Sequence, residues 1–166
     1  MTRTGTIAAG SVAVGCLVLA LKVLAWRVSA SAALFSDALE STVNVAASLL
    51  ALGALWLAAQ PADANHPYGH EKAEFFSAVI EGVLIVLAAL AIFQHAWITY
   101  QHPVMLRAPG QGMALNAVAT VLNGVWAVIL MRRGRLVRSP ALIADARHLT
   151  ADVVTSVGII VGIGLA

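Results

Sequence analysis

The sequence predicts an all-α membrane protein with about five transmembrane helices. Its 166 residues are 60% hydrophobic and 11% charged, whereas soluble domains carry roughly 25% charged residues. The mean hydropathy is +0.88. Apolar runs that approach or exceed the ~20 residues needed to cross a bilayer as a helix lie near residues 6–26, 32–59, 75–98, 113–131 and 141–165. A chain in lipid has to satisfy its own backbone hydrogen bonds, so each run is expected to be helical.

The first run is expected to be retained as a span, because it is long and has no cleavage pattern of small residues. The connection over residues 27–31 is short, which predicts a helical hairpin between the first two runs. Cys16 is the single cysteine. It offers neither a disulfide nor a thiolate metal site and is interpreted as an apolar filler.

Basic residues after the fourth run set the expected topology. Positively charged connections lie in the cytoplasm, which places residues 60–74 and the N-terminus there too. The outer connections hold Arg27 and Arg107, with Lys22 close by. We therefore expect an integral protein of the bacterial plasma membrane that contacts acidic lipid headgroups and not nucleic acid. The basic cluster consists of Arg132, Arg133, Arg135 and Arg138.

Polar residues inside the second and fifth runs are the main functional signal, since such residues usually face a bundle interior or a pathway. Glu40 and Asn44 are four residues apart, and Asp37 precedes Glu40 by three. All three therefore share one stripe of a helix. His148 and Asp152 are likewise four residues apart.

Depth in the membrane selects among these residues. At ~1.5 Å per residue, Glu40 and Asn44 lie about 12 and 18 Å below the outer face. His148 and Asp152 lie about 12 and 18 Å from the inner face, so the two pairs meet near the middle of a ~30 Å core. These four residues predict a roughly tetrahedral site for a divalent transition metal. Asp37, one turn further out, is expected to support the site or line its access path.

Hydrogen bonding between helices is the competing interpretation of polar residues in a membrane. We prefer it for Asn116 and Asn123, but not for two carboxylates and a histidine at matching depth. Glu81 fits either a proton relay or a structural partner for a neighbouring helix. Asp145, nearer a boundary, is assigned to the pathway. His95 and His102, at the outer end, are interpreted as solvated or capping residues.

The connection between the second and third runs is the most polar part of the chain. Asp63, His66 and His70 fall within eight residues of one another. A carboxylate and two imidazoles at this spacing could bind zinc in a turn.

Three segments together resemble the cation diffusion facilitator family of divalent-metal/proton antiporters. They read SDALESTVNVAASLLAL, QPADANHPYGHEKAEFFSAVIEG and DARHLTADVVTSVGIIVG, and the resemblance covers nearly all of the chain. It implies a transport site at two residues four apart on helix two and at H-x-x-x-D on helix five. A second, inner-loop metal site, a homodimer and a lysine that locks the dimer are implied as well. The corresponding residues are Glu40, Asn44, His148 and Asp152 for transport, Asp63, His66 and His70 for the loop, and Lys72 for the dimer lock.

Two departures from the family pattern stand out. The helix-two pair is usually built from Asp and His, whereas here it is Glu40 and Asn44, and an amide is a weaker ligand than a carboxylate. Members have six spans and usually a cytoplasmic C-terminal domain, and neither the sixth span nor that domain is expected within residues 1–166. The sequence is therefore interpreted as a C-terminally truncated transmembrane cation-efflux domain.

The predicted function is efflux of a divalent transition metal by metal/proton antiport, with no enzymatic activity and no organic cofactor. A histidine ligand favours zinc, while iron, cobalt, nickel, cadmium and manganese stay open. The first alternative is a truncated, non-transporting bundle or subunit. A membrane metalloenzyme is less favoured, because the sequence has no H-E-x-x-H motif and no nucleophile elbow.

Overall fold

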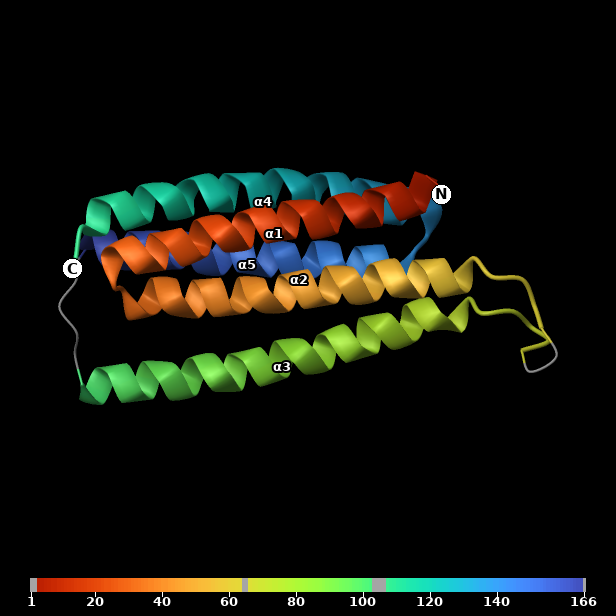
Figure 1. Ribbon diagram of the computed structural model, residues 1–166, viewed down its shortest axis with the longest axis horizontal. Helices are drawn as coiled ribbons and strands as arrows, with labels where there is room; N and C mark the ends of the chain where they lie inside the picture. Colours follow the sequence, from red (N-terminus) through yellow and green to blue (C-terminus); the bar gives the residue numbers. More distant parts are fainter. Residues whose placement is uncertain (1–2, 64–65, 103–106, 166) are drawn as a thin grey trace.

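The computed structural model describes residues 3–63, 66–102 and 107–165, and five long helices make up most of these ranges. Each is long and apolar enough to cross a membrane, and all five run along one common axis (Figure 1). The predicted all-α fold with five membrane-length helices is confirmed. The helices are α1 (Arg3–Ser29), α2 (Ala32–Ala58), α3 (Lys72–Gln101), α4 (Pro109–Val137) and α5 (Pro140–Leu165).

Several helices extend beyond the apolar runs of the sequence. The helix α3 begins at Lys72 and ends at Gln101, where hydropathy predicts residues 75–98. Helix α4 continues to Val137 and so includes three of the four clustered arginines. Hydropathy detects the part of a helix that lies in hydrocarbon, whereas the backbone hydrogen bonds continue into the polar interface.

The turn between α1 and α2 is formed by two residues, Ala30 and Ser31. Ala30 has a left-handed backbone conformation, with φ of 54°. The Ser31 hydroxyl accepts a hydrogen bond from the Leu34 N–H (3.5 Å) and thereby caps the start of α2. The Arg107 N–H donates to the Ser29 carbonyl (2.8 Å) and ties the connection before α4 to this turn. The predicted hairpin is present.

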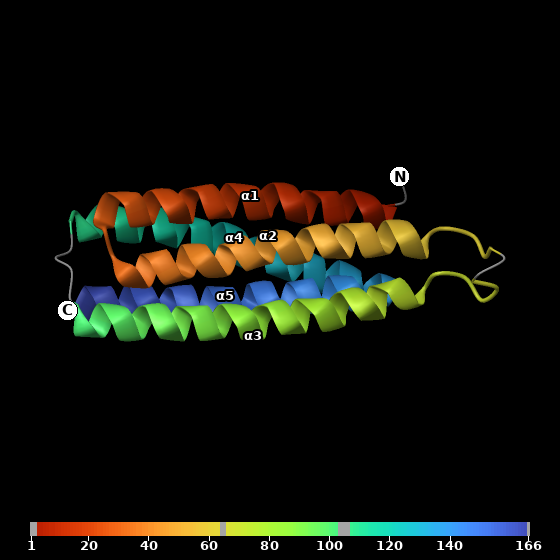
Figure 2. The same ribbon diagram turned by 60° about the horizontal axis from the view of Figure 1, so that its bottom comes forward.

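Helix α3 lies at one side of the bundle. It packs against α2 and α5, while α1, α2, α4 and α5 also pack against one another in pairs. Figures 1 and 2 show α3 along the outside of the other four. Among its described residues, Ser77, Glu81 and Ala88 are buried. The N-terminus and the α2–α3 loop lie at the same end of the bundle, and the described chain ends at the opposite end (Figure 1).

The interior of the bundle divides into an apolar part and a polar part. An apolar cluster forms around Leu130, Leu142 and Leu149. Elsewhere the fully buried side chains include charged and amide groups, while large apolar side chains such as Phe75 and Phe76 are exposed. Outward-facing apolar groups and inward-facing charges are typical of a membrane bundle with a functional interior.

Close packing between α4 and the α1–α2 hairpin depends on Gly112. A Cβ atom at this position would lie 2.7 Å from Ser29 Cβ and 3.1 Å from the Ala25 carbonyl oxygen. Gly112→Ala should therefore lower the free energy of unfolding by about 1–3 kcal/mol, measured by thermal unfolding in detergent. Gly53→Ala is the matched control, because a Cβ there meets nothing within 4 Å. Equal stability of the two variants would contradict this packing.

Candidate functional site

Three carboxylates from α2 and α5 converge inside the bundle. One oxygen each of Asp37, Glu40 and Asp152 lies within 4.8 Å of the others. Asp37 and Asp152 are buried, and Glu40 is half-buried. The structure thus brings Glu40 and Asp152 together, the pair that helix depth places at one level.

The sequence predicts that Asp37 lies one turn beyond the site. In the structure, its carboxylate is part of the acidic cluster itself. Side chains on a helix point back toward its N-terminus. The longer Glu40 side chain therefore reaches back toward the level of Asp37. A depth counted from backbone positions along the helix axis does not include this direction of the side chains.

Lys22 of α1 lies at the centre of the acidic cluster and is fully buried. Its Nζ is 2.8 Å from Asp37 Oδ1 and 2.8 and 2.9 Å from the two carboxylate oxygens of Asp152. The sequence indicates only that Lys22 is close to the outer connections, and neither its burial nor its two ion pairs was expected. A lysine cation in a membrane interior needs a carboxylate partner, and its position within an apolar run was the signal that could have revealed the pairing.

Two neutral side chains complete the hydrogen bonds of the cluster. Asn123 Nδ2 of α4 donates to Asp152 Oδ2. The Ser156 hydroxyl accepts from Lys22 Nζ (3.0 Å) and donates to Asp37 Oδ1 (2.8 Å). Both oxygens of Asp152 are therefore engaged, whereas Asp37 Oδ2 has no hydrogen-bond partner among the described residues.

Asn44 and His148, the other two predicted ligands, lie one turn from the cluster along α2 and α5. Both are buried. In the described part of the chain, neither side-chain atom of Asn44 has a hydrogen-bond partner, nor does His148 Nε2. Buried polar atoms without partners cost about 1–3 kcal/mol each, so their presence needs an explanation. Glu40 and His148 also line one hollow of about 440 Å³ beside α3.

A second acidic level lies nearer the end of the bundle that carries the α2–α3 loop. Asp145 precedes Asp152 by two turns and accepts hydrogen bonds from the Ser48 hydroxyl (3.2 and 3.3 Å). Glu81 of α3 is buried, and neither of its carboxylate oxygens has a partner within the described ranges. These positions suit residues that line a path between that end and the acidic cluster.

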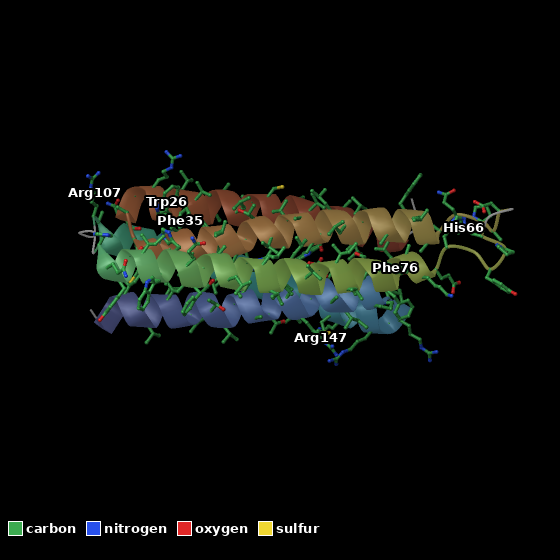
Figure 3. All side chains as sticks on the ribbon, turned by 90° about the horizontal axis from the view of Figure 1, so that it is seen from below. Trp26, Phe35, His66, Phe76, Arg107 and Arg147 are labelled. Atoms are coloured by element: carbon green, nitrogen blue, oxygen red, sulfur yellow. The ribbon has the colours of Figure 1, made fainter. Side chains whose placement is uncertain are left out.

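The α2–α3 loop brings Asp63, His66 and His70 together, with one ligand atom of each within 4.8 Å of the others. His66 Nδ1 is 3.1 Å from Asp63 Oδ1, and His70 Nε2 is 3.6 Å from Asp63 Oδ2. Figure 3 shows His66 in the loop beyond the end of the helices. Lys72 follows as the exposed first residue of α3.

The remaining polar residues of the sequence analysis have separate positions. The His95 ring packs 4.4 Å from the Phe35 ring near the hairpin end, and His102 is the C-terminal cap residue of α3. Asn123 makes the expected interhelical hydrogen bond. The expectation for Asn116 was wrong for the described structure, because neither of its buried side-chain atoms has a partner there. Cys16 is exposed on α1.

Comparison with known proteins gives a consistent result. An uncharacterized transporter of Synechocystis sp. is 50% identical over 137 residues, which are 82% of this chain and 44% of the relative. The cation-efflux pump FieF of Serratia proteamaculans is 33% identical over 140 residues, 83% of this chain and 46% of the pump. The manganese efflux system protein MneP of Bacillus subtilis is 30% identical over 140 residues, 82% of this chain and 46% of that protein.

The chain spans less than half the length of these relatives. The cation efflux transmembrane domain matches it over residues 8–166, so the match includes all five helices and both clusters of candidate ligands. The resemblance noted in the sequence is thereby confirmed. The chain belongs to the cation efflux family, whose members are membrane transporters and not enzymes.

Proposed function

We propose that this chain forms the membrane pathway of a divalent transition-metal/proton antiporter. The observation that carries the proposal is the convergence inside the bundle of the buried Asp37 and Asp152 with the half-buried Glu40. Three carboxylates in hydrocarbon are costly unless they serve a cation or a proton pathway. Their position between α2 and α5, away from both ends of the helices, suits a site reached alternately from the two sides of the membrane.

Glu40, Asn44, His148 and Asp152 are the proposed ligands of the transported ion. Two carboxylates, an amide oxygen and an imidazole nitrogen form a donor set that a divalent transition metal accepts in tetrahedral geometry. The unpaired atoms of Asn44 and His148 support this assignment, because a cargo ion would supply their partner. We place Asp37 beside the ligands and Glu81 and Asp145 along the inner path.

Coupling to protons follows from the chemistry of these ligands. Carboxylate and imidazole groups bind metal in their deprotonated forms, so protons and metal compete for one site. A site that loads metal from the cytoplasm and meets a more acidic exterior exchanges its metal for protons there. Rocking of the bundle around the site would provide the alternating access.

Zinc is the first cargo to test, since His148 is an imidazole ligand. The carboxylate and amide oxygens would also accept manganese, and one of the relatives is named as a manganese efflux protein. Iron, cobalt, nickel and cadmium belong in the same competition series. Metal-specific uptake into proteoliposomes ranks these ions directly.

We place the protein in a bacterial plasma membrane with its N-terminus in the cytoplasm. The N-terminus, the α2–α3 loop and the arginine-rich end of α4 all lie at one end of the bundle (Figure 1), which supports this orientation. The Asp63, His66 and His70 loop site would then bind metal on the cytoplasmic side. Lys72, exposed beside it, is the proposed dimer-locking residue of a homodimer.

Asp152→Ala should abolish metal-driven proton movement in proteoliposomes, recorded with an enclosed pH-sensitive dye and added Zn²⁺. The reason is that Asp152 is both a proposed ligand and the main partner of Lys22. Thr150→Ala, on the exposed side of α5 and outside the hollow that Glu40 and His148 line, is the control. Unimpaired flux in the Asp152 variant would remove the site assignment and favour a non-transporting bundle.

Asn44→Leu should weaken Zn²⁺ binding by at least about tenfold, the effect of losing even an outer partner of a metal ligand. Its stability should be unchanged or higher, because the amide has no hydrogen-bond partner to lose in the described structure. Asn116→Leu removes another buried, unpaired amide and should leave Zn²⁺ affinity unchanged. A stability loss in the Asn44 variant without any change in affinity would point to a structural role.

Replacing both loop histidines, His66→Ala with His70→Ala, should lower the Zn²⁺ stoichiometry from two ions to one per chain. The remaining ion is bound within the bundle, so Zn²⁺ transport should persist. Equilibrium dialysis with metal analysis measures the stoichiometry. An unchanged count would exclude the loop as a metal site.

A further inference from the structure

Lys22 is a charged group that metal ligation does not explain. An ammonium group donates three hydrogen bonds and accepts none, so it cannot bind a metal cation. Yet it lies fully buried within the acidic cluster and makes ion pairs of 2.8 Å to both Asp37 and Asp152. Its role therefore has to be sought in its competition with the cargo.

The contacts of Asp152 show what Lys22 blocks. Lys22 Nζ lies 2.8 and 2.9 Å from the two carboxylate oxygens, and Asn123 donates to one of them. A metal ion bound to Asp152 would place a divalent charge within a few ångströms of the ammonium. Repulsion at that distance in a poorly screened interior is strong, so Lys22 has to leave Asp152 before the metal can bind there.

Asp37 offers Lys22 an alternative position. It already accepts from Lys22 through Oδ1 (2.8 Å), while its Oδ2 has no hydrogen-bond partner in the described part of the chain. The lysine side chain is a flexible four-carbon arm, and a small movement would transfer its donors from Asp152 to both oxygens of Asp37. Ser156, which contacts Lys22 and Asp37, would remain within reach.

We propose that Lys22 is a tethered cation that holds Asp152 in the metal-free protein and shifts onto Asp37 when the transported metal binds. The proposal rests on the proposed transport site. With all four groups charged, three carboxylates and one ammonium leave two negative charges, which one divalent ion neutralises. Lys22 thus weakens metal binding enough for release and makes α1 responsive to the cargo.

Lys22→Met should bind Zn²⁺ at least about tenfold more tightly, because the buried repulsion is gone. The measurement is a competition titration against a chromophoric chelator, in protein carrying His66→Ala and His70→Ala so that loop binding does not contribute. Lys22→Arg keeps the charge and should show no gain. Equal or weaker affinity in a folded Lys22→Met protein would overturn the proposal.

Asp37→Asn tests the alternative position of Lys22. With Lys22 present, this change should weaken Zn²⁺ binding more than it does in the Lys22→Met background, and a double-mutant cycle measures the difference. Equal effects in both backgrounds would mean that Asp37 is an ordinary ligand and would overturn the shift.

The double variant Lys22→Met with Asp37→Asn covers the case in which Lys22→Met alone does not fold. In the double variant, the loss of the Lys22 ammonium does not leave a charged Asp37 carboxylate without its partner. A gain in affinity over Asp37→Asn alone supports the proposal, and no gain overturns it. If the parent protein with the loop histidines replaced binds no Zn²⁺, Co²⁺ or Mn²⁺, the transport site itself fails. Failure of the further inference gives a different result, in which the parent protein binds metal normally and its affinity does not change when Lys22 is replaced.

Discussion

The buried ion pairs of Lys22 with Asp37 and Asp152 are the interaction on which the middle of the bundle depends. An unpaired charge at this depth would be destabilising by several kcal/mol. The pairs therefore fix the relative positions of α1, α2 and α5, and Asn123 adds α4 through its hydrogen bond to Asp152. At this level of the bundle, four helices are therefore held in register by polar contacts, while the apolar cluster around Leu130, Leu142 and Leu149 packs elsewhere in the interior.

The same contacts give the site its functional character. A cluster made for stability would satisfy every donor and acceptor, because partly satisfied networks are costly. Here the charged core of the cluster is paired, while Asn44, His148 and one oxygen of Asp37 have no partners among the described residues. Asn44 and His148 thus offer unpaired atoms to a ligand, whereas both oxygens of Asp152 are already engaged by Lys22. In the proposed transporter, binding at Asp152 would exchange this ion pair for the one that Lys22 makes with Asp37.

Much of this architecture follows from the sequence, because a membrane leaves few choices. Five apolar runs of membrane-spanning length predict helices. The i,i+4 spacing of the polar residues, combined with their depth in the membrane, predicts that Glu40 and Asp152 lie at the same level. Lys22 was missed because a lysine near the end of an apolar run normally extends toward the headgroups. Its burial depends on carboxylates 15 and 130 positions away, and only the side-chain contacts of Lys22 with α2 and α5 in the folded bundle reveal that pairing. The sequence also could not predict that the Asn116 amide has no hydrogen-bond partner in the described structure, because this depends on the orientations of the surrounding side chains.

The position of α3 has a consequence for the direction in which an ion can move. Its contribution to the hollow beside Glu40 and His148 consists of alanine, isoleucine and phenylalanine side chains, among them Ile85, Ala88 and Phe93. An ion moving sideways would lose its oxygen ligands and gain none, and bare charge in such surroundings is prohibitively costly. The apolar face of α3 therefore acts as an insulating wall. In the proposed transporter, this wall would keep a dehydrated ion from leaving sideways at the level of the hollow. Ser48 and Asp145, which contact each other, provide the next oxygen atoms along α2 and α5.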